Sequence, residues 1–322
     1  MLKLPKQLKY PLECVLEFRS NDRFLFRAAD IFELSNSTSE DCKKRLHSCH
    51  IYIICRRPLL SIVPGSVFQL DNSIRFEVKY RVRGVERIVE TEIPRGIFHE
   101  SEISIRAAEY PHRHLESLDV TGKVIGKTQI ANHAHVLPGL SSEVVDVEAM
   151  YIGKGMGGST KRLENHSTMQ RILADTNAAG GEMEIFCLTF AFEFRKNAAA
   201  LTESATRESA ERRLRQINGL KINKADQISL IEAAMIGYFG TSFYNTQYLK
   251  FPDGKHGVLK RIADVDVCGL VVQVDTTNIG GLKVYSKQAP SASTHYILYD
   301  FRRMRGEESV LKALGMEGHA VQ

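Results

Sequence analysis

Two stretches of the sequence carry side chains that could hydrolyse a phosphodiester bond. In the first, Tyr151 is followed by Lys154, Arg162 and His166, and in the second, Glu232 stands among apolar residues. The reaction needs an activated water, stabilised charge on the phosphoryl oxygens and help for the leaving oxygen. An arginine suits bidentate phosphate contact, a histidine can move a proton near neutral pH, and a carboxylate can hold a cation. These residue types supply a candidate for each requirement.

The first stretch, residues 147–173, reads as a strand, a glycine-rich turn and a helix. A short apolar run ends at Tyr151-Ile152-Gly153, and Ser159 or Thr160 can cap the helix that follows the turn. Residues at i, i+4, i+7 and i+11 of a helix share a face. We therefore expect one face, directed at the body of the domain, to carry Arg162, His166, Met169 and Leu173.

The second stretch, residues 231–245, continues a helix that should begin near Asn223 or Asp226. Glu232 lies within its apolar stripe. Because an unpaired buried charge is strongly destabilising, Glu232 should have a metal ion, a cation or a hydrogen-bonding group as its partner. The apolar positions of the stripe are Ile228, Ile231, Met235 and Phe239.

Together, the two stretches resemble the GIY-YIG nuclease superfamily. There, a strand ends in Tyr-Ile/Val-Gly-Lys, the next helix carries an arginine, often with a histidine four residues on, and a later helix carries a glutamate and leads into Tyr-Asn. The resemblance covers about a third of the chain and rests on short motifs. The matching residues, in the family's order, are Tyr151, Gly153, Lys154, Arg162, His166, Glu232, Tyr244 and Asn245.

The resemblance implies a metal-dependent endonuclease that cuts DNA, with RNA left open, in a setting such as restriction or antiphage defence. In this interpretation Glu232 holds one Mg²⁺ (or Mn²⁺), and Arg162 stabilises the pentacovalent phosphorane. Tyr151 hydrogen-bonds the attacking water, and His166 shuttles a proton. Lys154 and Asn245 are the implied substrate contacts, although for Asn245 we favour a role in fixing the loop after the glutamate helix.

The family's first motif, Gly-Ile-Tyr on the preceding strand, is missing from its expected place. It should lie some ten residues before Tyr151, but that region reads PGLSSEVVDVEA and holds no tyrosine. His133 and His135 are the substitutes within reach. Two hypotheses follow: a diverged nuclease, and a non-catalytic nucleic-acid-binding or scaffold protein that retains the fold.

Each proposed residue also has a structural interpretation. Glu232 and Arg162 could form an ion pair that bridges two helices, and Tyr151 and His166 could be core residues with satisfied polar tips. The turn GKGMGGSTKR lacks the GxxxxGK[ST] order of a nucleotide-binding loop. A nucleotide-triphosphatase is therefore rejected.

Composition indicates an ordinary globular protein. The 322 residues are 43% hydrophobic, and 43 basic against 38 acidic residues give a net charge of +5, a mild excess that permits a polyanionic partner. No stretch approaches the ~20 apolar residues of a membrane span, and the N-terminus has no apolar signal run. We expect a cytoplasmic protein with reduced cysteines and no membrane partner.

One cluster of cysteines and histidines offers enough ligands for zinc: Cys42, His47, Cys49, His50 and Cys55. We favour instead a Cys55 that is buried in a strand as a free thiol.

The expected fold class is α+β, in three ranges. Residues 1–118 form a β-rich N-terminal domain, residues 119–253 a small, mainly antiparallel GIY-YIG-like sheet with flanking helices, and residues 254–322 a β-rich C-terminal extension. The predicted elements are a hairpin turning at Asn21-Asp22, a strand at 51–55, a strand pair at 74–93 turning at Arg83-Gly84, a doubly buried strand at 183–194 and a helix at 197–217.

Two basic segments could contact a phosphate backbone. Each also has a solvated interpretation: Glu77 and Glu86 can pair across the strands at 74–93, and Glu208 and Glu211 can pair along the helix at 197–217. The basic residues are Arg75, Lys79, Arg81 and Arg83 in the strand pair, and Arg207, Arg212, Arg213 and Arg215 in the helix.

Overall fold

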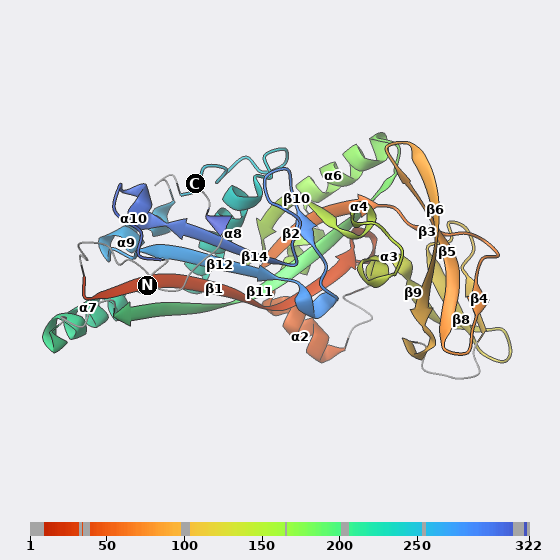
Figure 1. The fold of residues 1–322 in the computed structure, drawn as a ribbon, viewed down its shortest axis with the longest axis horizontal. Helices are drawn as coiled ribbons and strands as arrows, with labels where there is room; N and C mark the ends of the chain where they lie inside the picture. Colours follow the sequence, from red (N-terminus) through yellow and green to blue (C-terminus); the bar gives the residue numbers. More distant parts are fainter. Residues whose placement is uncertain are drawn as a thin grey trace.

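A curled mixed sheet of eight strands runs along the molecule (Figure 1). The structure is a computed structural model that describes residues 10–31, 34, 39–97, 104–164, 166–200, 206–252, 256–311 and 319–320. Smaller antiparallel sheets accompany the large one, so the fold agrees in general with the predicted α+β class. In order across the sheet, the strands are β13 (Val284–Tyr285), β10 (Val147–Lys154), β2 (Ile51–Pro58), β11 (Met183–Ala200), β1 (Leu12–Arg27), β12 (Gly269–Asp275), β14 (Thr294–Asp300) and β15 (His319–Ala320).

Three antiparallel strands, β10, β2 and β11, form the part of the sheet that carries the predicted site, with β2 between the other two. The uninterrupted apolar run of β2 is buried on both faces. Ile51 and Ile53 enter the core under one face, and Tyr52 and Ile54 enter the core under the other. The predicted strands at 51–55 and 183–194 are thus confirmed.

The predicted hairpin at the N-terminus is wrong. Residues 12–27 form one continuous strand, β1, which pairs with β11 along its whole length. The Asn21-Asp22 dipeptide marks a β-bulge, since the register shifts between Ser20 and Asp22. A bulge takes up an extra residue without reversing the strand, which is why turn-forming residues here do not make a turn.

The large sheet draws strands from all three predicted ranges. β1 and β2 come from residues 1–118, β10 and β11 from residues 119–253, and β12 and β14 from residues 254–322. Neither 118 nor 253 is therefore a border of this sheet. Such long-range pairings leave no local pattern in the sequence, so composition could not have placed them.

Between β2 and β10 the chain leaves the sheet and builds a separate β-rich unit at one end of the molecule (Figure 1). The predicted strand pair is confirmed, and the turn residues Arg83 and Gly84 have φ of 52° and 77°. The unit has an apolar core of its own, which includes Ile74, Phe76 and Val78. Its strands are β3 (Ser61–Ile62), β4 (Phe68–Gln69), β5 (Ser73–Val82), β6 (Val85–Pro94), β7 (Ser104–Ala107), β8 (His114–Leu118) and β9 (Val124–Gln129).

The basic face of β5 is matched by acids on β6. Lys79 and Arg81 lie 3.9 and 3.6 Å from Glu86, and Arg75 lies 3.8 Å from Glu90. These exposed pairs support the solvated interpretation of this face.

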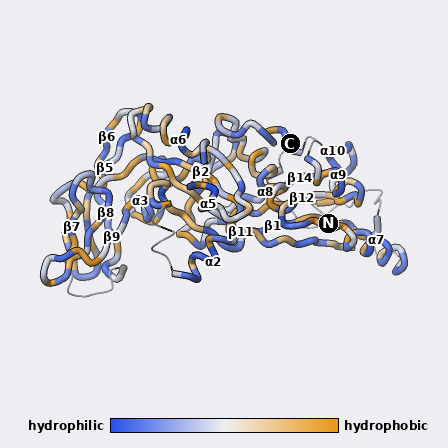
Figure 2. Tube along the Cα trace, turned by 180° about the vertical axis from the view of Figure 1, so that it is seen from behind, coloured by the Kyte–Doolittle hydropathy of each residue, from blue (hydrophilic) through white to orange (hydrophobic). Residues whose placement is uncertain are grey.

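Helices cover both faces of the sheet. One face packs on α8 (Lys224–Phe239) and α9 (Gly257–Asp264), and the other on α2 (Glu40–Ser48), α5 (Ser159–Glu164) and α6 (Ser167–Ala178). α7 (Arg207–Gly219) is hydrophilic along most of its length (Figure 2). No helix within the described residues is long and apolar enough to cross a bilayer.

The predicted helix at 197–217 begins late, because β11 continues to Ala200 in register with Leu12 of β1. Strand pairing overrides the helix propensity of the alanines there. Of its arginines, Arg207 and Arg212 pair with Glu211 and Glu208, at 2.9 and 3.2 Å. These pairs support the solvated interpretation of the helix.

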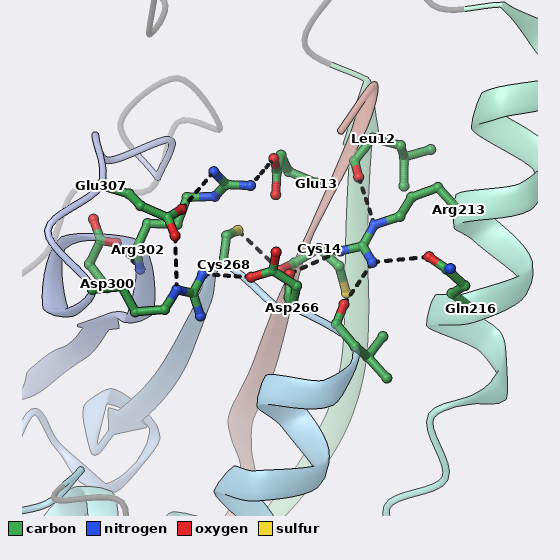
Figure 3. Close-up of polar contacts among 12 residues, drawn as sticks. Leu12, Glu13, Cys14, Arg213, Gln216, Asp266, Cys268, Asp300, Arg302 and Glu307 are labelled. Carbon is green, nitrogen blue, oxygen red and sulfur yellow. Dashed lines mark hydrogen bonds and ion pairs between the residues drawn. The ribbon is translucent and has the colours of Figure 1, made fainter. Parts of the chain in front are cut away.

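Arg213 is buried and belongs to a polar cluster between α7, β1 and the C-terminal part of the chain (Figure 3). Its guanidinium donates to the carbonyl oxygens of Leu12, Val265 and Asp266. Nearby, Arg302 on α10 (Phe301–Met304) forms a buried ion pair with Glu13 of β1. The cluster therefore ties β1 to α7 and to residues 265–302, and Arg213 is not available to a nucleic acid.

Candidate active site

The first stretch folds as a strand, a turn and two helices rather than one. α5 ends at Glu164, and α6 starts at Ser167 with His166 as its N-cap residue. Nδ1 of His166 accepts a hydrogen bond of 3.2 Å from the Met169 N–H, which closes the first turn of α6. The expectation of one helical face shared by Arg162 and His166 is therefore wrong. His166 is buried at the break, and Arg162 is exposed on α5.

Glycines make the tight approach between these segments possible. A Cβ on Gly155 would lie 2.5 Å from the Gly158 carbonyl oxygen, and Gly158 has φ of +93°. A Cβ on Gly153 would lie 2.5 Å from the hydroxyl of Tyr52 on the neighbouring strand. The turn and the end of β10 therefore admit no side chain at these positions.

α8 begins as predicted, with the Asn223 side chain accepting from the Asp226 N–H. Its Glu232 is buried, with 8% of its surface exposed, and Oε2 lies 2.8 Å from Nζ of Lys154 at the end of β10. The expected partner is thus confirmed, and it is Lys154 rather than Arg162. Burial raises the pKa of Glu232, while the Lys154 ammonium acts in the opposite direction.

Three rings gather beside this ion pair. The ring centroids of Tyr151 and His166 are 5.2 Å apart, and those of Tyr52 lie 6.2 and 5.8 Å from these two. Burial raises the pKa of both tyrosines, Glu232 adds to the rise, and Arg162 opposes it. Burial also lowers the pKa of His166, with a contribution from Arg162. Arg162 therefore acts on both tyrosines and on His166, and Glu232 acts on both tyrosines.

The sequence interpretation missed Tyr52. It lies on β2, where it pairs with Gly153 of the adjacent antiparallel strand, although it precedes Tyr151 by 99 residues. Its hydroxyl is buried, makes no hydrogen bond of good geometry among the described residues, and lies close enough to the Arg162 and Tyr151 side chains to interact with both. The available signal was the triplet His50-Ile51-Tyr52 at the start of a predicted strand, which a search confined to the ten residues before Tyr151 could not reach.

The histidines suggested as substitutes lie elsewhere. His133 ends α3 (Ile130–His133), and His135 lies in the turn that follows, so neither is on a strand. A Cβ on Gly280 would come within 2.7 Å of Nε2 of His135, and burial lowers the pKa of that histidine to about 4. These surroundings make His135 a neutral residue packed against a loop.

Asn245 clamps the loop after α8. Its Oδ1 accepts from the Ile152 N–H at 3.0 Å, and its Nδ2 donates to the Ile152 carbonyl oxygen at 2.8 Å. Thr241 donates a further hydrogen bond to Oδ1. These contacts of the buried amide fit the favoured role of Asn245 in fixing the loop.

The cysteines expected to be reduced are free thiols in the structure. Cys55 is buried on β2, and its Sγ donates to the Phe186 carbonyl oxygen. Nδ1 of His50 lies 3.0 Å from the Gly155 carbonyl oxygen. These contacts assign Cys55 to the core, as favoured.

A divalent cation is compatible with the site through Glu232 alone. No group of three or more His, Cys, Asp or Glu side chains suited to a metal occurs in the described part of the chain. Mg²⁺ commonly binds through one or two carboxylates, several waters and substrate phosphates, so a single carboxylate is an adequate protein ligand. Glu232 therefore suits a cation that binds together with the phosphate of a substrate.

These residues come from five elements: Tyr52 from β2, Tyr151 and Lys154 from β10, Arg162 from α5, Glu232 from α8 and His166 from the break before α6. The end of β10 is the meeting point. β13 pairs only with Val147 and Glu148, so the part of β10 from Tyr151 to Lys154 is an edge that α8 and α5 can approach. No family model, no curated protein and no solved structure matches the chain.

Proposed function

We propose that this protein is a metal-dependent endonuclease that hydrolyses phosphodiester bonds in DNA, with a diverged active site of the GIY-YIG type. One observation carries the proposal. Two tyrosines, a histidine, an arginine and a glutamate, which span 180 residues of the sequence, meet at the end of β10. Ion pairing alone would not require the tyrosines, and core packing would not require the charges.

The two tyrosines are suited to orient a water. Their raised pKa keeps both phenols protonated at neutral pH, so each can donate to or accept from a water molecule. The buried hydroxyl of Tyr52 interacts with the Arg162 and Tyr151 side chains, which places it beside the arginine proposed to bind the phosphate. Tyr52 thus takes the place of the tyrosine missing before Tyr151.

The cationic and acidic groups divide the remaining work. Arg162 is exposed and can bind phosphoryl oxygens through two parallel N–H groups. His166 uses Nδ1 to cap α6, which leaves Nε2 to hold or release a proton. Glu232 would hold the divalent cation, which would supply charge stabilisation at the phosphate when bound. Lys154 balances the Glu232 charge and lies within reach of the same phosphate.

The test is a plasmid-nicking assay with Mg²⁺ or Mn²⁺. We expect Glu232→Gln and Arg162→Ala each to lower the rate by about 100-fold or more, the usual scale for an electrostatic or acid–base group. The matched controls are Glu211→Gln and Arg207→Ala, which alter an exposed pair on α7 and should cut as the wild type does. Cleavage that survives in both site variants would remove this site from the reaction.

The competing function is nucleic-acid binding without cleavage. One contact favours it: the Lys154 ammonium already neutralises the Glu232 carboxylate, which competes with a metal for that oxygen. Retained binding of DNA with no nicking in either metal, over a range of pH, would support this function instead. Calorimetric titration of the wild type and of Glu232→Gln with Mn²⁺ shows whether the carboxylate binds a cation.

A further inference from the structure

A pocket lies beside the candidate active site and contributes nothing to the chemistry proposed above. Its volume is about 520 Å³. The turn after α8 supplies Phe243 and Tyr244, β10 supplies Met150, α6 supplies Thr176, and a loop before β14 supplies Lys287. The lining mixes aromatic and apolar side chains with polar and charged ones, so a ligand here could both stack and form hydrogen bonds.

Phe243 is the unusual member of this pocket. Although it is a phenylalanine, 70% of its surface is exposed. Its ring meets that of Tyr244 edge to face at 4.7 Å, and the Arg171 guanidinium lies 5.9 and 5.4 Å from the two ring centroids. Tyr244 is held in turn by a hydrogen bond of 2.9 Å to Asp175. The result is a braced aromatic platform with an open face.

The acidic side chains around the pocket are already paired with arginines, so the pocket suits a neutral, flat ligand. Glu148 pairs with Arg56 at 2.8 Å, Asp175 with Arg171 at 3.8 Å, and Glu182 with Arg81 at 3.7 Å. Lys287, by contrast, is exposed and forms no ion pair within the described residues. Each acid is therefore matched by an arginine, and one surplus ammonium stands at the rim, where a phosphate could lie.

The pocket and the active site share their supports. Met150 lines the pocket, and the next residue is Tyr151; Tyr244 lines the pocket, and the next residue is Asn245, which is bonded to Ile152. α6 joins the two places, with His166 at its start and Asp175 nine residues later, about 13 Å along a helix at 1.5 Å per residue. A strand that follows α6 would have one nucleotide at the active site and another at the pocket.

We infer that this pocket binds an unpaired nucleobase of the substrate strand, a few nucleotides from the phosphate at the active site, by stacking on Phe243. The inference rests on the proposed function for the nature of the ligand. Bases stack on exposed aromatic rings with little dependence on sequence, and a paired base inside a duplex cannot enter such a pocket. The substrate is therefore single-stranded or locally unpaired DNA.

The test measures binding of single-stranded oligonucleotides by the full chain carrying Glu232→Gln, in buffer without divalent metal so that the oligonucleotides stay intact. Phe243→Ala is expected to raise the Kd about 5- to 150-fold, the range that loss of one stacked base produces. 2-Aminopurine placed at successive positions should be quenched at one or two neighbouring positions, and this quenching should vanish in Phe243→Ala. Phe243→Trp should restore both affinity and quenching.

Phe68→Ala is the matched control, since Phe68 is 61% exposed on β4, outside the pocket. It should bind as the parent does. Equal affinity and equal quenching with and without Phe243 would overturn the inference, as would an equal loss in Phe68→Ala. If wild-type protein cuts DNA while Phe243 has no effect, only this inference fails. If binding depends on Phe243 but the wild type never cuts, only the proposed reaction fails.

Discussion

At the scale of single residues, the site contains buried groups that are less stable in the folded protein than in water: a carboxylate and a phenol hydroxyl. Burial raises the pKa of Glu232, so its ionised form is less stable in the folded chain than in the unfolded one. The carboxyl group thus stabilises the fold below its ordinary pKa, and that contribution is lost as pH rises through the raised value. The buried hydroxyl of Tyr52 makes no hydrogen bond of good geometry among the described residues, which also lowers stability. Residues kept for stability alone would have neither property.

Tyr52→Phe separates a catalytic from a structural role for this tyrosine. We expect cleavage to fall roughly 100-fold, because a positioned proton-transfer group contributes at least about that much. The free energy of unfolding should change by less than about 1 kcal/mol, because the hydroxyl makes no hydrogen bond of good geometry and the variant keeps the ring. The measurements are plasmid nicking and urea denaturation.

Tyr299→Phe is the matched control for that experiment. Tyr299 is also buried, but its hydroxyl donates to the Ala234 carbonyl oxygen at 2.8 Å. Its loss should lower stability by roughly 0.5–1.5 kcal/mol, the net contribution of one hydrogen bond, and should leave cleavage intact. Full activity in Tyr52→Phe would restrict Tyr52 to packing.

At the scale of elements, the break between α5 and α6 gives His166 two functions, and substitutions can separate them. Asparagine is a good N-cap residue but carries no titrating proton. We expect both variants to lose cleavage and the packing of the buried ring, and His166→Ala to be less stable than His166→Asn by about 1 kcal/mol, the contribution of the cap. Nicking rates and thermal unfolding of the two variants provide the measurement.

Thr206→Ala provides the comparison, because Thr206 caps α7 through the Ser209 N–H, far from the proposed chemistry. It should lose stability alone. Wild-type cleavage by His166→Asn would leave the histidine with the capping role only.

Local sequence patterns predicted some helices, strands and turns correctly and others wrongly. The helix starting at Asn223, the strand at 51–55 and the turn at Arg83-Gly84 were predictable because caps, apolar runs and turn residues act within a few positions. The break before His166 was not, because helical spacing across residues 162–173 is the same with or without an interruption. The bulge in β1 was misread because a bulge and a turn favour the same residue types.

At the scale of the whole molecule, the site depends on pairings that local sequence cannot reveal. Glu232 and Arg162 were identified from their own segments, whereas Tyr52 was found only because β2 lies against β10. The residues between these strands form the separate β-rich unit, which lengthens the path from Tyr52 to Tyr151 without separating them in space. A motif search that allows a domain-sized insertion would have recovered the tyrosine.

The buried pair of Glu13 and Arg302 holds this long-range arrangement at the far end of the sheet (Figure 3). Their side chains are 0% and 4% exposed, and Arg302 also contacts Glu307 at 3.1 Å. Arg302→Ala strands the Glu13 charge, so we expect the free energy of unfolding to fall by roughly 3–5 kcal/mol. Replacing both partners with leucine should recover much of this loss, while Arg207→Ala, at an exposed pair, should change stability by less than about 1 kcal/mol. The measurement is urea denaturation of the wild type, Arg302→Ala, the double leucine variant and Arg207→Ala. An unchanged free energy of unfolding in Arg302→Ala would show that packing alone joins β1 to the C-terminal part of the chain.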